Sequence, residues 1–178
     1  RPVSVIRASG LRSAIRKCGT ACRPTTDGQA FAGDNPLFLT YSNPVYDYVK
    51  SPDQETATPA HHPLVVVGAG PVGMAAAIDA AQHGIRVLVL DDDNTVSVGS
   101  RAICYSKRAL EIMDRLGCAE PMVKKGVTWK VGKIFFRDQL VRTFDLLPGE
   151  GYKMPAFINL QQYYFEQYMA KNMRELEN

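Results

Sequence analysis

The sequence VVVGAGPVGMAAAIDAAQHGIRVLVLD, at residues 65–91, decides the fold of this chain. Its β-branched start predicts a short buried strand, and three glycines spaced G-x-G-x-x-G follow. The Ala-rich run after them predicts a helix, in which Pro71 suits the first turn and Gly84 the C′ position. The run IRVLVLD predicts a second strand that is buried on both faces, as in a parallel sheet. We therefore expect a Rossmann-like β-α-β unit and an α/β fold class.

The glycines have separable roles in a nucleotide-binding turn. Gly68 permits the tight turn out of the strand, Gly70 leaves room for a pyrophosphate, and Gly73 lets the helix lie close to the strand. Backbone N–H groups of the first helical turn would face the phosphates, with the positive end of the helix dipole behind them. The expected pyrophosphate-binding residues are Gly68, Ala69, Gly70, Pro71, Val72 and Gly73.

An acidic run stands at the end of the second strand. Asp91 comes about 20 residues after Gly68, the offset at which dinucleotide folds place the acid that binds the adenosine ribose. Asp92 lies next to it, and together with Asp93 these carboxylates should repel a 2′-phosphate, which argues against NADP in this pocket. FAD and NAD share an ADP half, so the turn and the acid alone leave both open.

The sequence after this unit favours FAD over NAD. An NAD-binding fold would continue with another helix and strand. Here a polar loop leads to a helix expected over about 106–116, with Ser106 as its N-cap. Residues 127–136 and 139–146 then predict antiparallel strands inserted around a polar turn. A last helix is expected from about Asn159, and we interpret its aromatic and methionine residues as core packing.

At this point the chain resembles the class A FAD-dependent aromatic hydroxylases, of the 3-(3-hydroxyphenyl)propionate and phenol hydroxylase kind. The resemblance rests on the glycine turn with its flanks, on SVGSRAICYSKRALEIMDRLG and on PAFINLQQYYFEQYM, and it covers residues 63–178. It implies that FAD is the cofactor and that Asp91, usually a glutamate in this family, binds its ribose. It also implies that Arg101 approaches the FAD diphosphate and ribityl region. Gln162, in a Q-x-x-x-E pattern, would face the ribityl chain.

The resemblance implies an enzyme that uses NAD(P)H and O₂ to hydroxylate a small aromatic, phenolic substrate with bound FAD. It implies no catalytic residue in this chain, because the family's remaining flavin contacts and most of its substrate cavity lie further along the sequence. We therefore expect an incomplete domain that holds the ADP-binding half of the site and is inactive alone. Two alternatives stay open: another FAD oxidoreductase, such as an oxidase or dehydrogenase, and a non-catalytic nucleotide-binding module.

The sequence divides into three regions. Residues 1–36 carry basic and small residues without a period, which predicts a disordered or artefactual leader, with a transit peptide as the alternative. Residues 37–63 mix aromatics with prolines and predict an extended arm or linker. Residues 64–178 are expected to be the N-terminal part of the FAD-binding domain. The composition of this arm leaves open that it wraps a partner subunit, and therefore that the protein is a homo-oligomer.

Composition narrows the remaining function classes. The 178 residues are 46% hydrophobic, which suits one globular domain, and a net charge of +3 gives no reason to expect nucleic acid as a partner. No apolar run approaches the roughly 20 residues that cross a bilayer, so we expect no membrane segment. Four cysteines predict reduced thiols in a cytoplasmic protein. Neither the Cys18/Cys22 pair nor His61 and His62 have further ligands at metal spacing, so we expect no metal site.

Overall fold

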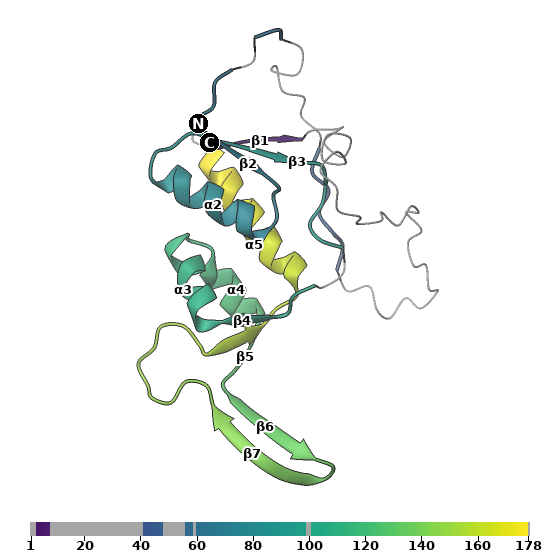
Figure 1. The fold of residues 1–178 in the computed structure, drawn as a ribbon, viewed down its shortest axis with the longest axis vertical. Coiled ribbons are helices and arrows are strands. Elements are labelled where there is room, and N and C mark those ends of the chain that lie inside the picture. Colours follow the sequence, from purple (N-terminus) through teal and green to yellow (C-terminus); the bar gives the residue numbers. More distant parts are fainter. Residues whose placement is uncertain (1–2, 8–40, 48–55, 59, 99–100, 178) are drawn as a thin grey trace, which may run out of the picture.

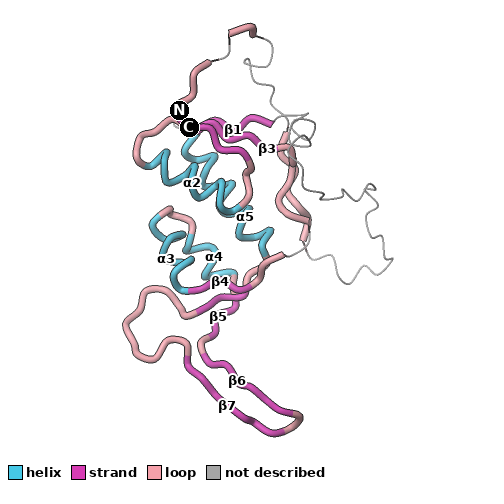
Figure 2. The backbone as a smooth tube through the Cα atoms, in the orientation of Figure 1, coloured by secondary structure: helices cyan, strands magenta, loops and turns pink. Residues whose placement is uncertain are grey.

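The computed structural model describes residues 3–7, 41–47, 56–58, 60–98 and 101–177. Figure 1 shows a small parallel sheet at one end, with helices beside it and a long hairpin at the other end. Figure 2 shows the same order as a change from strand to helix and back to strand along the long axis. Most of the expected leader, including Cys18 and Cys22, lies outside the described residues.

The expected β-α-β unit is present, which confirms the α/β class. Strand β2 (Leu64–Val67) leads through the glycine turn into helix α2 (Pro71–Gln82), and strand β3 (Val87–Asp91) returns parallel to β2. Gly84 ends α2 in the left-handed region, at a φ of 77° that only glycine adopts without cost. The Pro and Gly positions therefore bound this helix as the sequence predicts.

The two strands of this unit differ in burial. Val87 and Val89 of β3 are buried, as the apolar run predicts. The expected burial of β2 is wrong in part, because Val65 and Val67 are 45% and 60% exposed. The sheet order β1-β3-β2 explains the difference, since β3 is central and β2 lies at the edge. Alternate β2 side chains therefore point away from the face that the helices cover.

Strand β1 (Val3–Arg7) differs from the expectation of a disordered leader over residues 1–36. It pairs with β3 in parallel, with Val5 opposite Val89. The sequence VSVIR is rich in β-branched residues, which favour strands. The free edge of β3 supplies the backbone partners that this short segment needs, and no local signal in the sequence points to that edge.

The chain from residue 107 to residue 125 forms two helices. Helix α3 (Lys107–Arg115) begins after Ser106, whose hydroxyl accepts a hydrogen bond from the Ala109 N–H at 3.4 Å, so the predicted N-cap is confirmed. Helix α4 (Ala119–Lys125) was not expected. It follows α3 after a break at Gly117, whose φ is 80°.

The strands after β3 form two further sheets. Strands β4 (Cys104–Ser106), β8 (Phe157–Asn159) and β5 (Val127–Trp129) pair antiparallel in the order β4-β8-β5. Strands β6 (Val131–Phe136) and β7 (Gln139–Asp145) form a separate hairpin. The expected antiparallel strands are thus confirmed, but the strand expected over 127–136 divides between the two sheets.

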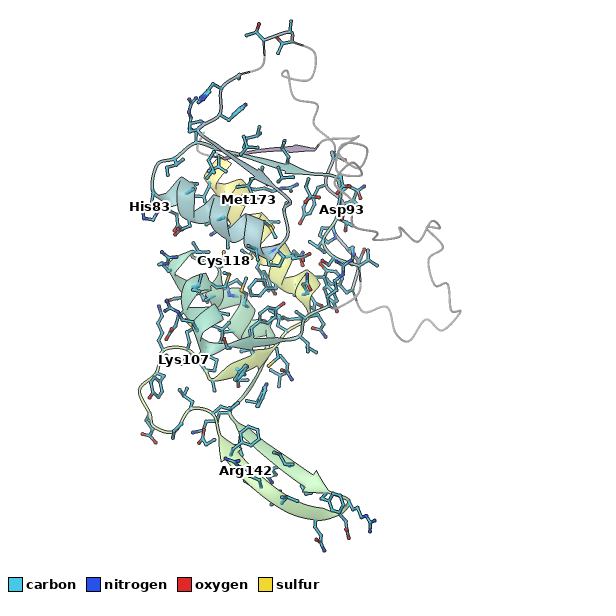
Figure 3. The ribbon with its side chains drawn as sticks, viewed as in Figure 1. His83, Asp93, Lys107, Cys118, Arg142 and Met173 are labelled. Atoms are coloured by element: carbon cyan, nitrogen blue, oxygen red, sulfur yellow. The ribbon has the colours of Figure 1, made fainter. Side chains whose placement is uncertain are left out.

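Helix α5 (Gln162–Glu177) begins later than expected, because Asn159 still belongs to β8. Its buried face carries Phe165, Met169 and Met173, which confirms that this face packs in the core. Met173 lies on the part of α5 that runs beside α2 (Figure 3). None of the described helices is long and apolar enough to cross a membrane.

One described segment of the arm, residues 41–47, packs against the body of the protein. Val45 forms an antiparallel bridge with Thr95, in the loop that follows β3. The Tyr41 ring stacks on Tyr163 of α5 at 4.1 Å between ring centroids. This segment therefore covers both α5 and the loop, whereas its composition predicts a linker without packing contacts.

Candidate functional site

The glycine turn is held to β3 by its own backbone. Gly68 has a φ of 102°, a conformation that L side chains rarely adopt, and its N–H donates to the Leu90 carbonyl at 2.7 Å. The chain therefore leaves β2 sharply and stays attached to the end of β3. The role that the sequence predicts for Gly68 requires this conformation.

Gly73 and Gly70 show why a larger side chain is excluded at one position and not at the other. A Cβ atom at Gly73 would lie 1.9 Å from the Gly68 carbonyl oxygen, so α2 can approach the turn only with glycine there. A Cβ atom at Gly70 would meet nothing within 4 Å. The turn thus leaves open space at the N-terminus of α2, where the side chain of Val72 is 85% exposed. This space fits a pyrophosphate bound by backbone N–H groups.

Asp91 lies directly against this turn. Its Oδ2 accepts a hydrogen bond from the Ala69 N–H, and its Oδ1 accepts one from the Asp93 N–H at 2.7 Å. Figure 3 shows Asp93 on the side of the sheet from which α2 starts, with His83 at the opposite end of that helix. The carboxylate therefore stands between the turn and the next loop, where it can also accept hydrogen bonds from a ribose.

Replacing Asp91 by alanine is expected to weaken FAD binding by about 10- to 100-fold, the range for loss of a hydrogen bond to a charged group. It also removes the acceptor of the Ala69 and Asp93 N–H groups, so stability should fall by about 1 kcal/mol. Titration calorimetry with FAD and urea unfolding measure the two effects. Asp138→Ala, at an exposed turn residue, is the control. A loss of stability without a loss of FAD affinity would assign Asp91 to the fold alone.

The same three acidic residues also form the group best placed to hold a metal among the described residues. Ligand atoms of Asp91, Asp92 and Asp93 lie within 4.8 Å of one another. Asp92 and Asp93 are exposed, and both Asp91 oxygens already accept backbone hydrogen bonds. This arrangement is that of an acid bracing a turn, and exposed acidic groups are common without an ion.

Arg101 and Gln162 lie at the same end of the β4–β8 strand pair, since Arg101 precedes β4 and Gln162 follows β8. Cys104 of β4 lies opposite Asn159 of β8, and the Leu160 N–H donates to the Ile103 carbonyl at 2.7 Å. The two strands are antiparallel, so the chain before β4 and the chain after β8 leave in the same direction. Arg101 is exposed, and no ion pair joins it to another described residue. Gln162 is half-buried at the start of α5.

A buried carboxylate, which the sequence analysis did not select, lies beside Gln162. Glu166 is 4% exposed and accepts hydrogen bonds from Ser97 and from Gln162. The ring of Tyr105 stacks on Phe165 at 4.3 Å nearby. Burial, and then the charge of Glu166, raise the pKa of Tyr105 to about 12. The final E of the Q-x-x-x-E pattern was the available signal, but its burial depends on how the loop folds over α5.

Comparison with known proteins supports this reading of the turn. A family model described as an FAD binding domain matches residues 61–177. The chain is 38% identical to a rifampicin monooxygenase of Streptomyces venezuelae over 72 residues, which is 40% of this chain and 15% of that protein. It is also 38% identical to a para-nitrophenol 4-monooxygenase of Pseudomonas sp. over 64 residues, or 36% of this chain and 16% of that protein.

The fold of this chain is also similar to that of a solved monooxygenase structure. The crystal structure of p-nitrophenol 4-monooxygenase from Pseudomonas putida superposes with a TM-score of 0.58 at 27% identity. The match covers 65% of this chain and 30% of that one. The chain thus spans less than a third of the length of each of these three proteins.

Proposed function

The chain belongs to the FAD binding domain family, and from that premise we propose that it forms the ADP-binding half of the FAD site of an aromatic monooxygenase. The observation that carries the proposal is the position of the Asp91 carboxylate against the Ala69 N–H, beside the open space at Gly70. An acid at the ribose position and a turn open to a pyrophosphate are the two features that an ADP moiety needs.

Each proposed contact with FAD uses a backbone N–H group or a polar side chain of this chain. Backbone N–H groups at the start of α2 would bind the pyrophosphate, and Asp91 would accept from the ribose hydroxyls. Arg101 offers several fixed donors to the diphosphate and ribityl region, and Gln162 an amide to the ribityl chain. The bound flavin supplies the redox chemistry, while these residues bind and orient it. We assign no catalytic residue to this chain.

The proposed reaction is hydroxylation of a phenolic ring with O₂ and with NAD(P)H as reductant. The names of the relatives support it, since a para-nitrophenol 4-monooxygenase is among them. The acidic run Asp91–Asp93 disfavours a 2′-phosphate in this pocket, so NAD(P)H is proposed as a co-substrate that binds elsewhere. We also propose a cytoplasmic location, where NAD(P)H is available and where the thiols of Cys104 and Cys118, free in the structure, stay reduced.

Purification of the complete protein tests the proposal. We expect a yellow protein whose oxidation of NADH or NADPH is accelerated by a phenolic substrate, with one atom of ¹⁸O₂ recovered in the hydroxylated product. Stoichiometric hydrogen peroxide without a hydroxylated product would indicate an oxidase in place of a monooxygenase. A colourless protein that takes up no added FAD would overturn the assignment of the site.

A further inference from the structure

Glu166 is a buried carboxylate whose hydrogen-bond partners come from two different segments. Its Oε2 accepts from the Ser97 N–H at 2.7 Å, and its Oε1 accepts from the Ser97 hydroxyl at 2.7 Å and from Gln162 Nε2 at 2.6 Å. Ser97 belongs to the loop after β3, and Gln162 lies one turn earlier on α5. Glu166 is the one buried polar or charged residue of the described chain.

This network determines the direction of the Gln162 side chain. Gln162 Nε2 also lies 3.2 Å from the Ser97 hydroxyl oxygen, so the amide nitrogen is directed into the network. The amide oxygen accepts no hydrogen bond from the described residues. It is therefore left to accept one from a hydroxyl group outside the network.

Two described residues that flank Arg101 in the sequence, Ser97 and Ile103, are also held near the start of α5. Ser97 is four residues before Arg101, and it is tied to α5 through both its backbone N–H and its hydroxyl. Ile103, on the other side of Arg101, is tied to Leu160 just before α5. The loop is thus attached to the start of α5 on both sides of Arg101.

We propose that Glu166 is a positioning residue for FAD: together with Ser97 it holds the Gln162 side chain so that the amide oxygen faces the ribityl side of the cofactor. The inference rests on the proposed FAD site. A carboxylate is needed because it can accept all three hydrogen bonds at once. An apolar residue of similar size would fill the core equally well and leave Gln162 free to rotate.

Glu166→Gln tests this role in the complete protein, because its amide nitrogen must face at least one of the three donors. The FAD dissociation constant is expected to rise about tenfold, consistent with the loss of a hydrogen bond to a charged group. ADP lacks the ribityl chain and makes no contact with Gln162 in the proposed site. Its affinity is therefore expected to change less than about twofold. Calorimetric titration of both ligands, with urea unfolding alongside, gives the readouts.

The control variant makes the same Glu→Gln substitution at an exposed position of α5. Glu175→Gln makes the same substitution on the same helix at a side chain that is 65% exposed, and it should alter neither affinity. Ser97→Ala removes one donor from the network and should weaken FAD alone by about threefold, while Ser97→Thr keeps the hydroxyl and should restore affinity. If Glu166→Gln does not fold, the Ser97 pair decides the question.

The outcomes separate this inference from the proposed function. Selective loss of FAD affinity in Glu166→Gln and Ser97→Ala supports the positioning role. Unchanged FAD affinity, or parallel loss of FAD and ADP affinity together with stability, would overturn it and leave the FAD site standing. A wild-type protein that binds ADP but not FAD would overturn both.

Discussion

Replacing Gly73 by alanine is expected to destabilise the protein by about 3 kcal/mol, the upper part of the range for overpacking. The new Cβ would lie 1.9 Å from the Gly68 oxygen and 3.2 Å from Val66 Cγ1. Alanine normally stabilises a helix by about 1 kcal/mol over glycine, which is too little to offset this overlap. Either the turn or α2 must move, and α2 carries the buried Met74 and Ile78. Urea unfolding followed by far-UV circular dichroism measures the loss.

Gly70→Ala is the matched control for this prediction. It adds the same methyl group at the other end of the turn, where nothing lies within 4 Å. Gly70 has φ −72° and ψ 178°, which any L-residue adopts, so no strain is expected. Its stability should stay within about 0.5 kcal/mol of wild type, as for most surface changes. Equal stability of Gly73→Ala and Gly70→Ala would show that α2 is not held against the turn as the structure has it.

The β-α-β unit could be predicted because its signals are local. The glycine spacing, Pro71, Gly84 and the apolar run before Asp91 each specify a backbone conformation without help from distant residues. Strands β4 and β8 are different, since each has three residues and forms only by pairing with strands that lie far away in the sequence. Strand β1 depends in the same way on the edge of β3. Short strands with distant partners carry too little pattern to be found in a sequence.

The residues of the candidate site also differ in whether local sequence or distant contacts determine their positions. The glycine turn and Asp91 are set by chain geometry, and the structure brings them into contact. Whether Glu166 is a solvated helix residue or a buried acceptor depends on Ser97, which is 69 residues away in the sequence. The backbone hydrogen bond between Ile103 and Leu160, which follows Arg101 in the sequence, likewise forms only once β8 lies beside β4. Local motifs therefore predict the residues of the proposed ADP end of the site, whereas tertiary contacts determine the surroundings of Gln162 at its proposed ribityl end.

Gly70→Val is expected to abolish FAD uptake while leaving the fold nearly intact. The open space at Gly70 that tolerates a larger side chain is the same space in which a pyrophosphate would lie against the backbone. Gly70 is the N-cap of α2 and makes no side-chain cap hydrogen bond, and valine is less favoured than glycine at that position, so the replacement should cost about 1 kcal/mol. The variant should therefore purify colourless, bind neither FAD nor ADP, and unfold in urea close to wild type.

Other substitutions in and around the turn should give different combinations of ligand binding and stability from Gly70→Val. Val72→Ala shortens an exposed side chain but keeps the backbone N–H, so it should still bind FAD. Gly73→Ala should lose cofactor and stability together, and Glu166→Gln should bind FAD about tenfold more weakly but keep its affinity for ADP. Only Gly70→Val should lose both ligands and keep most of its stability, because only there does the added Cβ enter the phosphate space with no protein atom within 4 Å. Normal FAD binding by a folded Gly70→Val protein would place the pyrophosphate elsewhere and refute the geometry proposed for this turn.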